Sequence, residues 1–347
     1  MEFGSDFHII DNLPQGTSLL ELLATEVNLY ADGRQPIECI LQHEKIQRLW
    51  VPSYHCHDSL AGLHRKGYEL NYYNFTPGED LEKAISSIPI EQGDAVMVIN
   101  HFGLSGKPEI SDRDFILIED HSHDLISDWS RTSDADWCFA SLRKTLPIAD
   151  GGILWSPRRK ALPAPPQATL PATENSERRY EAMRLKARYL KGWNVQKEDY
   201  LKIFRETEER FDSLPISAIS QAGKEIISAL DIRGWYQAKK ENWDILRKSI
   251  SSSKRCKVIE AQNIGGTPFS LILLFDNTEL RDRVRAALIE NNVFPAILWS
   301  IPDNVNRQSE DFGRNMLSIH CDGRYNSDHI KRLAMIINTI LSNDTNN

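Results

Sequence analysis

The sequence has few cysteines and contains no long apolar run. The cysteines are far apart and form no CxxC pair; the five are Cys39, Cys56, Cys138, Cys256 and Cys321. An odd, scattered set implies no disulfide framework and favours reduced thiols in a cytoplasm. No segment approaches the roughly 18 unbroken apolar residues needed to span a bilayer, and MEFGSDFHII lacks the basic and apolar regions of a signal peptide. We therefore expect an unprocessed cytoplasmic protein without a membrane segment.

The sequence also lacks an internal repeat and an excess of one charge. The net charge of -8 is spread over many short clusters, which gives no general attraction to nucleic acid or to an anionic membrane. The missing repeat argues against a stacked array. The chain does have length and apolar content. Its 347 residues, 41% of them hydrophobic, can form a sizeable core and two lobes.

Short apolar runs alternate with helical segments in the first part of the chain. Runs such as VMVIN and FILI are typical of strands that are covered on both faces. Their spacing is that of βαβ units and predicts a parallel sheet. The expected strands are LWVPSY, YELNYYNF, AVMVIN and FILIED, and the expected helices cover residues 35–47, residues 59–66 and the region near Asp80.

The composition changes after Leu154. Five prolines fall within residues 156–176, too many for a helix or a central strand. Further on, the sequence predicts charged helices at 177–191 and near Ala222, strands at 269–275 and 294–299, helices at 279–291 and 327–341, and the apolar segment MLSIHCD. We expect a large domain at 1–215, which includes the proline-rich excursion, and a small C-terminal α/β domain at 216–347.

Ionisable residues gather where the predicted strands end. These ends read PSYHCH, NHFG, EDHSH and SLRK. Ligands bind in the crevice beyond the carboxyl ends of the strands of an open α/β sheet, so we expect the site there. Asp120 ends the buried run FILIED and can stay ionised beside a cation, because opposite charges 4 Å apart attract by about 4 kcal/mol at intermediate dielectric.

One suitable cation is the protonated ring nitrogen of pyridoxal 5'-phosphate, which an acidic residue keeps protonated so that the ring acts as an electron sink. Such a site also needs a lysine that bonds the cofactor and a cup for its phosphate. Lys144 follows the next predicted strand, with Ser141 three residues before it. Gly33 lies at a predicted helix N-terminus, where free N–H groups favour a phosphate, and Arg34 adds charge.

Together these segments resemble the DegT-type sugar aminotransferases, which are fold type I pyridoxal-phosphate enzymes. The resemblance is carried by SLRKTLPIADGG preceded by IEDHSH, by GR opening an early helix, and by VPSYHC and NHFG between them. It covers residues 30–155, and less closely LSIHCDGRY near the end of the chain. It implies a large domain whose mainly parallel sheet holds the cofactor, a small C-terminal α/β domain, and a site at a homodimer interface.

Position by position, the resemblance implies roles for five residues. Lys144 corresponds to the lysine that bonds the cofactor, and Asp120 to the partner of the pyridine nitrogen. His123 falls where the family places a glutamine or histidine that hydrogen-bonds the ring hydroxyl. Ser141 corresponds to the phosphate-binding serine, and Gly33 lies in the N-terminal phosphate loop.

Two positions depart from the family's pattern. The phosphate loop reads Asp-Gly-Arg at 32–34, where better-known members have Ser-Gly-Thr. The aromatic residue that stacks on the ring in the family is replaced here by Cys56. Either the Cys56 sulfur covers the ring, or a neighbour such as His55 or His57 does.

Several further residues allow more than one interpretation. His123 can contact the ring or lie on the surface, and His101, beside a glycine, can bind a ligand or be structural. Arg324 can approach a substrate carboxylate or phosphate, although a surface turn is favoured. Alternating histidines and a cysteine at 55–57 and 121–123 suit zinc, but their spacing matches no standard ligand pattern, so no metal is predicted.

The predicted reaction is a ping-pong transamination. Glutamate is the expected amino donor, a nucleotide-linked keto-sugar is the expected acceptor, and Lys144 moves the α-proton. Two alternatives stay open. Another pyridoxal-phosphate reaction, such as elimination or dehydration on a sugar, would use the same cofactor residues, and a non-catalytic protein could have kept the fold.

Overall fold

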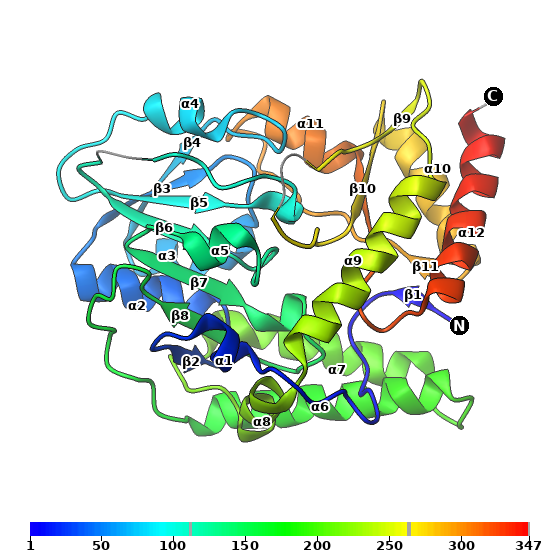
Figure 1. Cartoon of the computed structure of the whole chain (residues 1–347), viewed down its shortest axis with the longest axis horizontal. Coiled ribbons are helices and arrows are strands. Elements are labelled where there is room, and N and C mark those ends of the chain that lie inside the picture. Colours follow the sequence, from blue (N-terminus) through cyan, green and yellow to red (C-terminus); the bar gives the residue numbers. More distant parts are fainter. Residues whose placement is uncertain (111–112, 262–264, 346–347) are drawn as a thin grey trace.

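A computed structural model describes residues 1–110, 113–261 and 265–345 of the chain. It has a seven-stranded main sheet on one side and a three-stranded sheet on the other, with one long helix running diagonally between them (Figure 1). Both chain ends lie on the side of the smaller sheet (Figure 1). This arrangement confirms the predicted class, an α/β fold with a large and mainly parallel sheet.

The main sheet has the strand order β2-β8-β7-β6-β5-β3-β4. The pairings among β3, β4, β5, β6 and β7 are parallel, whereas β8 pairs antiparallel with both β7 and β2. The carboxyl ends of the five parallel strands therefore meet at one edge of the sheet. The strands are β2 (Asn28–Tyr30), β3 (Arg48–Pro52), β4 (Glu69–Tyr73), β5 (Ala95–Ile99), β6 (Ile116–Asp120), β7 (Trp137–Ser141) and β8 (Gly152–Trp155).

Short helices connect these strands. The N-caps follow local chemistry: the Ser127 hydroxyl accepts the N–H of Ser130 at the start of α5, and Gly33 precedes α2. Three 3-10 turns lie at strand ends, at His57–Leu60, His101–Gly103 and Leu142–Lys144. The helices of this part are α1 (Leu19–Leu23), α2 (Arg34–Glu44), α3 (Ala61–Arg65), α4 (Leu81–Ser86) and α5 (Asp128–Thr132).

The two faces of the main sheet pack against different helices. Ile118 and Phe139 lie in the core cluster that contains the buried side chains of α2 and α3. Leu117 and Cys138 lie in the cluster on the other face, with residues of α1, α5 and the helices that follow the sheet in sequence. Because side chains alternate along a strand, Asp120 points to the same face as Ile118, toward α2.

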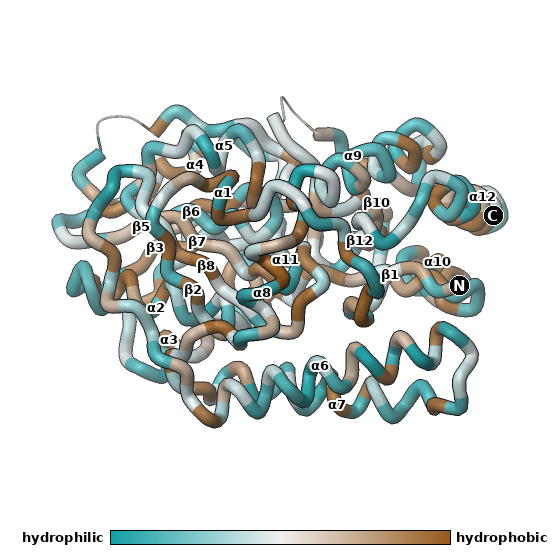
Figure 2. The backbone as a smooth tube through the Cα atoms, turned by 60° about the horizontal axis from the view of Figure 1, so that its bottom comes forward, coloured by the Kyte–Doolittle hydropathy of each residue, from teal (hydrophilic) through white to brown (hydrophobic). Residues whose placement is uncertain are grey.

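A helical hairpin follows the main sheet. Its helices α6 (Leu170–Leu190) and α7 (Lys197–Arg210) run side by side along one edge of the molecule (Figures 1 and 2). The predicted C-terminal boundary of the proline-rich excursion at 156–176 is wrong. The helix α6 already begins at Leu170. Pro171 occupies the first turn of α6, where a proline lacks no hydrogen bond that the helix would otherwise make.

The smaller unit is built on an antiparallel sheet of order β12-β10-β9. The predicted strand at 294–299 is wrong beyond Phe294, where β11 ends; the next residue is Pro295, which has no N–H to donate. Helices α9 and α11 have no counterpart among the expected elements. The elements are α8 (Gln221–Ala229), α9 (Ile232–Ser249), β9 (Cys256–Val258), β10 (Leu271–Phe275), α10 (Thr278–Glu290), α11 (Arg307–Asn315), β12 (Met316–Ile319) and α12 (Ser327–Thr345), and β1 (Phe3–Gly4) pairs with β11 (Val293–Phe294).

The expected division of the chain at 215/216 stays a prediction. Phe3 packs in the core of the smaller unit, while Ile219 and Ile227 pack in the core of the main sheet, so the chain crosses between the two units more than once. All five cysteines are free thiols. Among the described helices, none combines the length and the apolar character needed to cross a bilayer.

Candidate active site

A cavity of about 200 Å³ lies at the carboxyl ends of β6 and β7, on the α2 face of the sheet. We call it the strand-end cavity. It brings together six of the seven residues predicted from the sequence: Gly33, Arg34, Cys56, Asp120, Ser141 and Lys144. The seventh, His123, lines a second cavity of about 290 Å³, which we call the adjoining cavity. Arg143, Lys144 and Trp299 line both cavities.

Glycine at position 33 lets the start of α2 lie directly against β7. A Cβ atom on Gly33 would lie 2.5 Å from the Cβ of Ser141, closer than real Cβ atoms approach one another. Gly152 is restricted in the same way, because its Cβ would lie 2.4 Å from the carbonyl oxygen of Asp32. The unpaired N–H groups at the start of α2 and the Ser141 side chain are thereby held on one wall of the strand-end cavity.

Asp120 is the last residue of β6 and pairs in parallel register with Phe139 of β7. Its side chain is buried, and its Oδ1 accepts the N–H of Ser122 at 2.8 Å. Within the described residues, no cation lies within ion-pair distance of this carboxylate. A buried carboxylate with a single hydrogen bond is costly, so the position favours a cationic ligand.

Lys144 closes the 3-10 turn after β7 and has buried imidazoles around it. Its ammonium nitrogen lies 5.6 Å from the centroid of the Trp299 ring, on the boundary between the two cavities. Burial and the charge of Lys144 lower the pKa of His55 well below its usual value. The same two causes bring the pKa of His101 down to about 4, although its hydrogen bond to the Tyr54 carbonyl raises it. In the described chain no carboxylate forms an ion pair with Lys144.

His123 presents one defined tautomer. Its Nδ1 accepts the backbone N–H of Phe102 at 3.0 Å, and burial together with the charge of Lys144 lowers its pKa well below the usual value. The neutral ring therefore carries its proton on Nε2, which makes that atom a donor. The ring stacks on Phe269, with centroids 4.3 Å apart, and lies nearly parallel to Trp299.

The structure narrows the set of residues that can cover a cofactor ring. His55 and Cys56 line the strand-end cavity, whereas His57 turns away and packs on Tyr72. Trp299 lines the cavity as well, although it is more than 150 residues away in sequence from Lys144. The Nε2 of His55 bonds to the Ser59 hydroxyl, and its Nδ1 is buried without a hydrogen-bond partner in the described chain.

Sequence reasoning missed Trp299, Arg143 and Glu208, which also line the strand-end cavity. Arg143 is part of SLRK and could have been recognised there as a basic residue at a strand end. Trp299 and Glu208 come from segments that no local pattern connects with the strand ends.

Two other candidates have structural partners. His101 Nε2 lies 2.6 Å from the carbonyl oxygen of Tyr54, inside the core. Arg324 lines the adjoining cavity, but its guanidinium forms a bidentate pair with Asp322, with both N–O distances 2.8 Å. Arg324 also donates to the carbonyl oxygens of Ser5 and Asp6, so it fixes the N-terminal segment. This position is not the surface turn that the sequence favoured.

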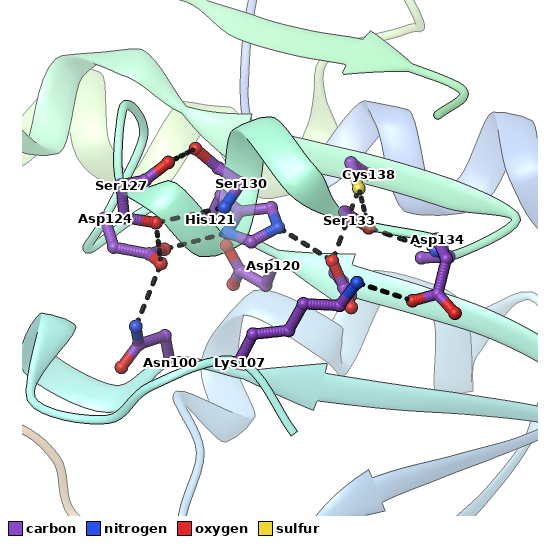
Figure 3. Close-up of polar contacts among 12 residues, drawn as sticks. Asn100, Lys107, Asp120, His121, Asp124, Ser127, Ser130, Ser133, Asp134 and Cys138 are labelled. Atoms are coloured by element: carbon purple, nitrogen blue, oxygen red, sulfur yellow. Dashed lines mark hydrogen bonds and ion pairs between the residues drawn. The ribbon is translucent and has the colours of Figure 1, made fainter. Parts of the chain in front are cut away.

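The opposite face of β6 carries a closed polar network. His121 lies between two carboxylates, with its Nε2 2.9 Å from Glu119 and its Nδ1 2.9 Å from Asp124. Asn100 and Ser127 donate to the other oxygen of Asp124 (Figure 3). Burial lowers the pKa of His121, but Asp124, Cys138 and Glu119 raise it well above its usual value, so the ring is an imidazolium.

Glu119, His121 and Cys138 lie close enough together to hold a metal ion. This trio differs from the histidine and cysteine set at 55–57 and 121–123 that was weighed from the sequence. Each member already has a hydrogen-bond partner, because the Cys138 thiol lies 3.5 Å from Glu119 and Glu119 bonds His121. The trio is therefore accounted for by hydrogen bonding within the protein.

The strand-end cavity suits pyridoxal 5'-phosphate in the chemistry of its groups. A buried carboxylate without a cation, an amine without an anion, and a helix N-terminus beside a serine hydroxyl correspond to the ring nitrogen, the aldehyde and the phosphate. One group is unexpected, because the Glu208 carboxylate lies in the same lining.

No protein-family model matches the sequence, and no curated protein matches it. Solved structures do match the fold. Spr1654 of Streptococcus pneumoniae, assigned as a sugar aminotransferase, superposes in its PMP form with a TM-score of 0.64, 10% identity, and coverage of 100% of this chain and 99% of that one. PseC of Helicobacter pylori, an aminotransferase of pseudaminic acid biosynthesis, superposes with a TM-score of 0.64 and 11% identity. That match covers 99% of this chain and 100% of the other.

A third match is a DegT DnrJ EryC1 StrS aminotransferase from Brucella abortus, with a TM-score of 0.60, 14% identity, and coverage of 92% of this chain and 87% of that one. At such identities the likeness establishes the fold. The predicted fold type is thereby confirmed, and the reaction has to be argued from the residues of the site.

Proposed function

We propose that this protein is a pyridoxal-phosphate-dependent aminotransferase that transfers an amino group from glutamate to a keto-sugar, with a nucleotide-linked sugar as the expected acceptor. The observation that carries the proposal is that Asp120, at the end of β6, and Lys144, in the turn after the neighbouring β7, line one cavity together with Gly33 and Ser141. Pyridoxal phosphate supports several reactions, and the likeness of the fold to sugar aminotransferases favours transamination of a sugar among them. A homodimer is expected from the same resemblance.

Different residues would hold the phosphate, the ring nitrogen and the ring oxygen of the cofactor. Gly33, Arg34 and Ser141 would hold the phosphate through N–H groups, a guanidinium and a hydroxyl. Asp120 would accept the hydrogen bond of the ring nitrogen, and its negative charge would keep the proton there. His123 would donate from Nε2 to the ring oxygen, because Phe102 already occupies its Nδ1.

When bound, pyridoxal phosphate supplies an electron sink for the bond that loses its proton. The amine of Lys144 would take the α-proton from the donor and later give it up, acting first as base and then as acid. No carboxylate of the described chain forms an ion pair with Lys144, so no salt bridge holds its amine away from the cavity that it lines. The rings of Trp299 and His123 lie nearly parallel beside Lys144 and would shield its amine from water on that side.

Absorbance spectroscopy and product analysis test this proposal. Purified protein with pyridoxal phosphate should show a visible band that shifts when glutamate is added, and nitrogen-15 from labelled glutamate should appear in the product from one of a panel of keto-sugars. Lys144→Ala should lose the band and about 10⁴-fold in rate, since the acid and base group is removed. Lys240→Ala is the control, because this half-buried lysine pairs with Asp244 on α9 and lies outside both cavity linings.

Other results would point elsewhere. A band without nitrogen in the product would indicate elimination or dehydration on a sugar. A protein that binds no cofactor at any concentration would contradict the proposal and favour a non-catalytic role for the fold.

A further inference from the structure

Three arginines converge on one carboxylate in the wall between the two cavities. Arg143 forms a bidentate pair with Glu208 of α7, with N–O distances of 2.7 and 2.8 Å. Arg179 of α6 lies 3.3 Å from the same carboxylate, and Arg34 lies 3.6 Å from it. All three guanidiniums also lie over the ring of Phe211, with the Arg143 carbon 4.6 Å from its centroid. We call these three arginines the arginine cluster.

The cluster reaches both cavities. Arg34 and Arg143 line the strand-end cavity, and Arg143 and Arg179 line the adjoining one. An anion placed against Arg143 from either side would therefore meet two guanidiniums. Planar guanidinium groups bind phosphate oxygens in bidentate fashion, which makes such a pair a strong phosphate site.

Glu208 holds this position, but its side chain is the easiest of the four to displace. Its side chain is 42% exposed, whereas those of Arg143 and Arg179 are 15% and 7% exposed. Glu208 is the one carboxylate of the described chain within ion-pair distance of Arg143, while Arg34 also pairs with Asp32 and Arg179 with Asp6. Movement of Glu208 would leave Arg143 needing another anion.

The electrostatics agree with this geometry. Burial raises the pKa of Glu208, but Arg143 and Arg179 lower it to about 2, so the carboxylate is charged at every physiological pH. Burial and the charge of Arg143 lower the pKa of Arg179, a sign that the positive charges repel one another. A phosphate carries more charge and more acceptor oxygens than a carboxylate, so it satisfies the cluster better.

We propose that the arginine cluster is a phosphate-binding site, and that the Glu208 carboxylate occupies it until a phosphate-bearing ligand displaces it. Two sources share this chemistry, the phosphate of the cofactor in the strand-end cavity and the phosphate of a substrate in the adjoining cavity. The naming of the cofactor and a substrate as the two sources of phosphate rests on the proposed function. Binding of phosphate to the cluster itself needs neither cofactor nor reaction.

The test is calorimetric titration of the cofactor-free protein with inorganic pyrophosphate. Glu208→Gln keeps the size of the side chain and removes the competing charge, so the affinity should rise about tenfold. Glu206→Gln is the matched control on α7, because Glu206 pairs with the exposed Arg178 and lies outside the cavity linings. The affinity of Glu206→Gln for pyrophosphate should equal that of the wild type. Thermal unfolding of both variants reports whether they are folded.

A second variant keeps the test decisive if Glu208→Gln is unstable. Arg179→Gln removes one guanidinium and should lower the affinity for pyrophosphate about tenfold. Unchanged or weaker binding in a folded Glu208→Gln protein, or unchanged binding in Arg179→Gln, would overturn the proposal.

Two further arms identify the source of the phosphate. If the cofactor's phosphate displaces Glu208, then Glu208→Gln should tighten binding of pyridoxal 5'-phosphate and leave binding of pyridoxal unchanged. If a substrate's phosphate does, the gain in pyrophosphate affinity should persist after the protein has been saturated with pyridoxal phosphate. A protein that binds pyrophosphate as expected but no pyridoxal phosphate would sink the proposed function and leave the anion site standing.

Discussion

The two faces of β6 carry similar ionisable residues, but the protein treats them in opposite ways. On one face Glu119, His121 and Asp124 are buried and serve as one another's hydrogen-bond and ion-pair partners. On the other face Asp120 and Lys144 line a cavity, and neither has an ion-pair partner in the described chain. The charged groups of the first set have partners within the protein, whereas those of the second set favour a ligand of opposite charge. The comparison separates residues that hold the fold from residues that hold a substrate or cofactor.

The largest effect should come from substituting neighbours on opposite faces. Asp120→Asn removes the charge that would keep the ring nitrogen protonated, and we expect the transamination rate to fall roughly 10³-fold, the scale of losing one preorganised electrostatic contact. Urea unfolding should change little. Glu119→Gln, one residue away, should instead lower stability and leave the rate within a few-fold of the wild type. Equal losses of rate in the two variants would remove the distinction between the faces.

The next effect is on stability. His121→Gln leaves two buried carboxylates without their cation, so the free energy of unfolding should fall by about 3 kcal/mol. The variant should still bind pyridoxal phosphate and show the visible band. His64→Gln, at an exposed position of α3, serves as the control and should unfold like the wild type. A stable His121→Gln protein that has lost the cofactor would place His121 in the site.

A smaller effect is expected at the phosphate wall. Ser141→Ala removes one hydroxyl that would bond the cofactor's phosphate, and a hydrogen bond to a charged group contributes about 2 kcal/mol. The dissociation constant of pyridoxal phosphate, measured by absorbance titration, should rise by about ten- to thirtyfold. Ser130→Ala, in the network on the other face, should leave that constant unchanged.

The smallest effect is a pH dependence of stability. The folded pKa of His121 is raised above 6.5, so its contribution is fully present below pH 6.5 and is lost as the pH rises through the folded value. In that upper window the wild type should lose up to about 1.4 kcal/mol per pH unit relative to His121→Gln. The folded pKa of Glu119 is lowered, so its contribution is present above about pH 4.5 and is lost in acid. A difference between the two proteins that does not vary with pH above 6.5 would show that His121 is neutral.

The sheet and part of the site could be predicted because both follow from local pattern. Continuous apolar runs mark strands that are covered on both faces, and the carboxyl ends of parallel strands meet at one edge, which brings Asp120 and Lys144 together. The same reasoning could not place Glu208 and Trp299, which reach the cavity from α7 and from the segment after β11. Their positions depend on how the hairpin and the smaller unit pack, and no short sequence pattern encodes that packing.

Some local errors have simple physical causes. Prolines suggested an irregular segment up to residue 176, yet a proline fits the first turn of a helix, and α6 starts at Leu170. The role of His123 as a partner of the ring hydroxyl stays a prediction. Its Nδ1 is fixed by the N–H of Phe102, and its ring lines the adjoining cavity, stacked on Phe269.

The central claim is that the amine of Lys144 bonds the cofactor in a cavity where Asp120 meets its ring. The most direct measurement is borohydride reduction of the protein incubated with pyridoxal phosphate, followed by digestion and mass spectrometry. We predict a single stoichiometric label on Lys144, present at reduced occupancy in Asp120→Asn. A label on another lysine, or none when the protein is saturated with pyridoxal phosphate, would contradict the account.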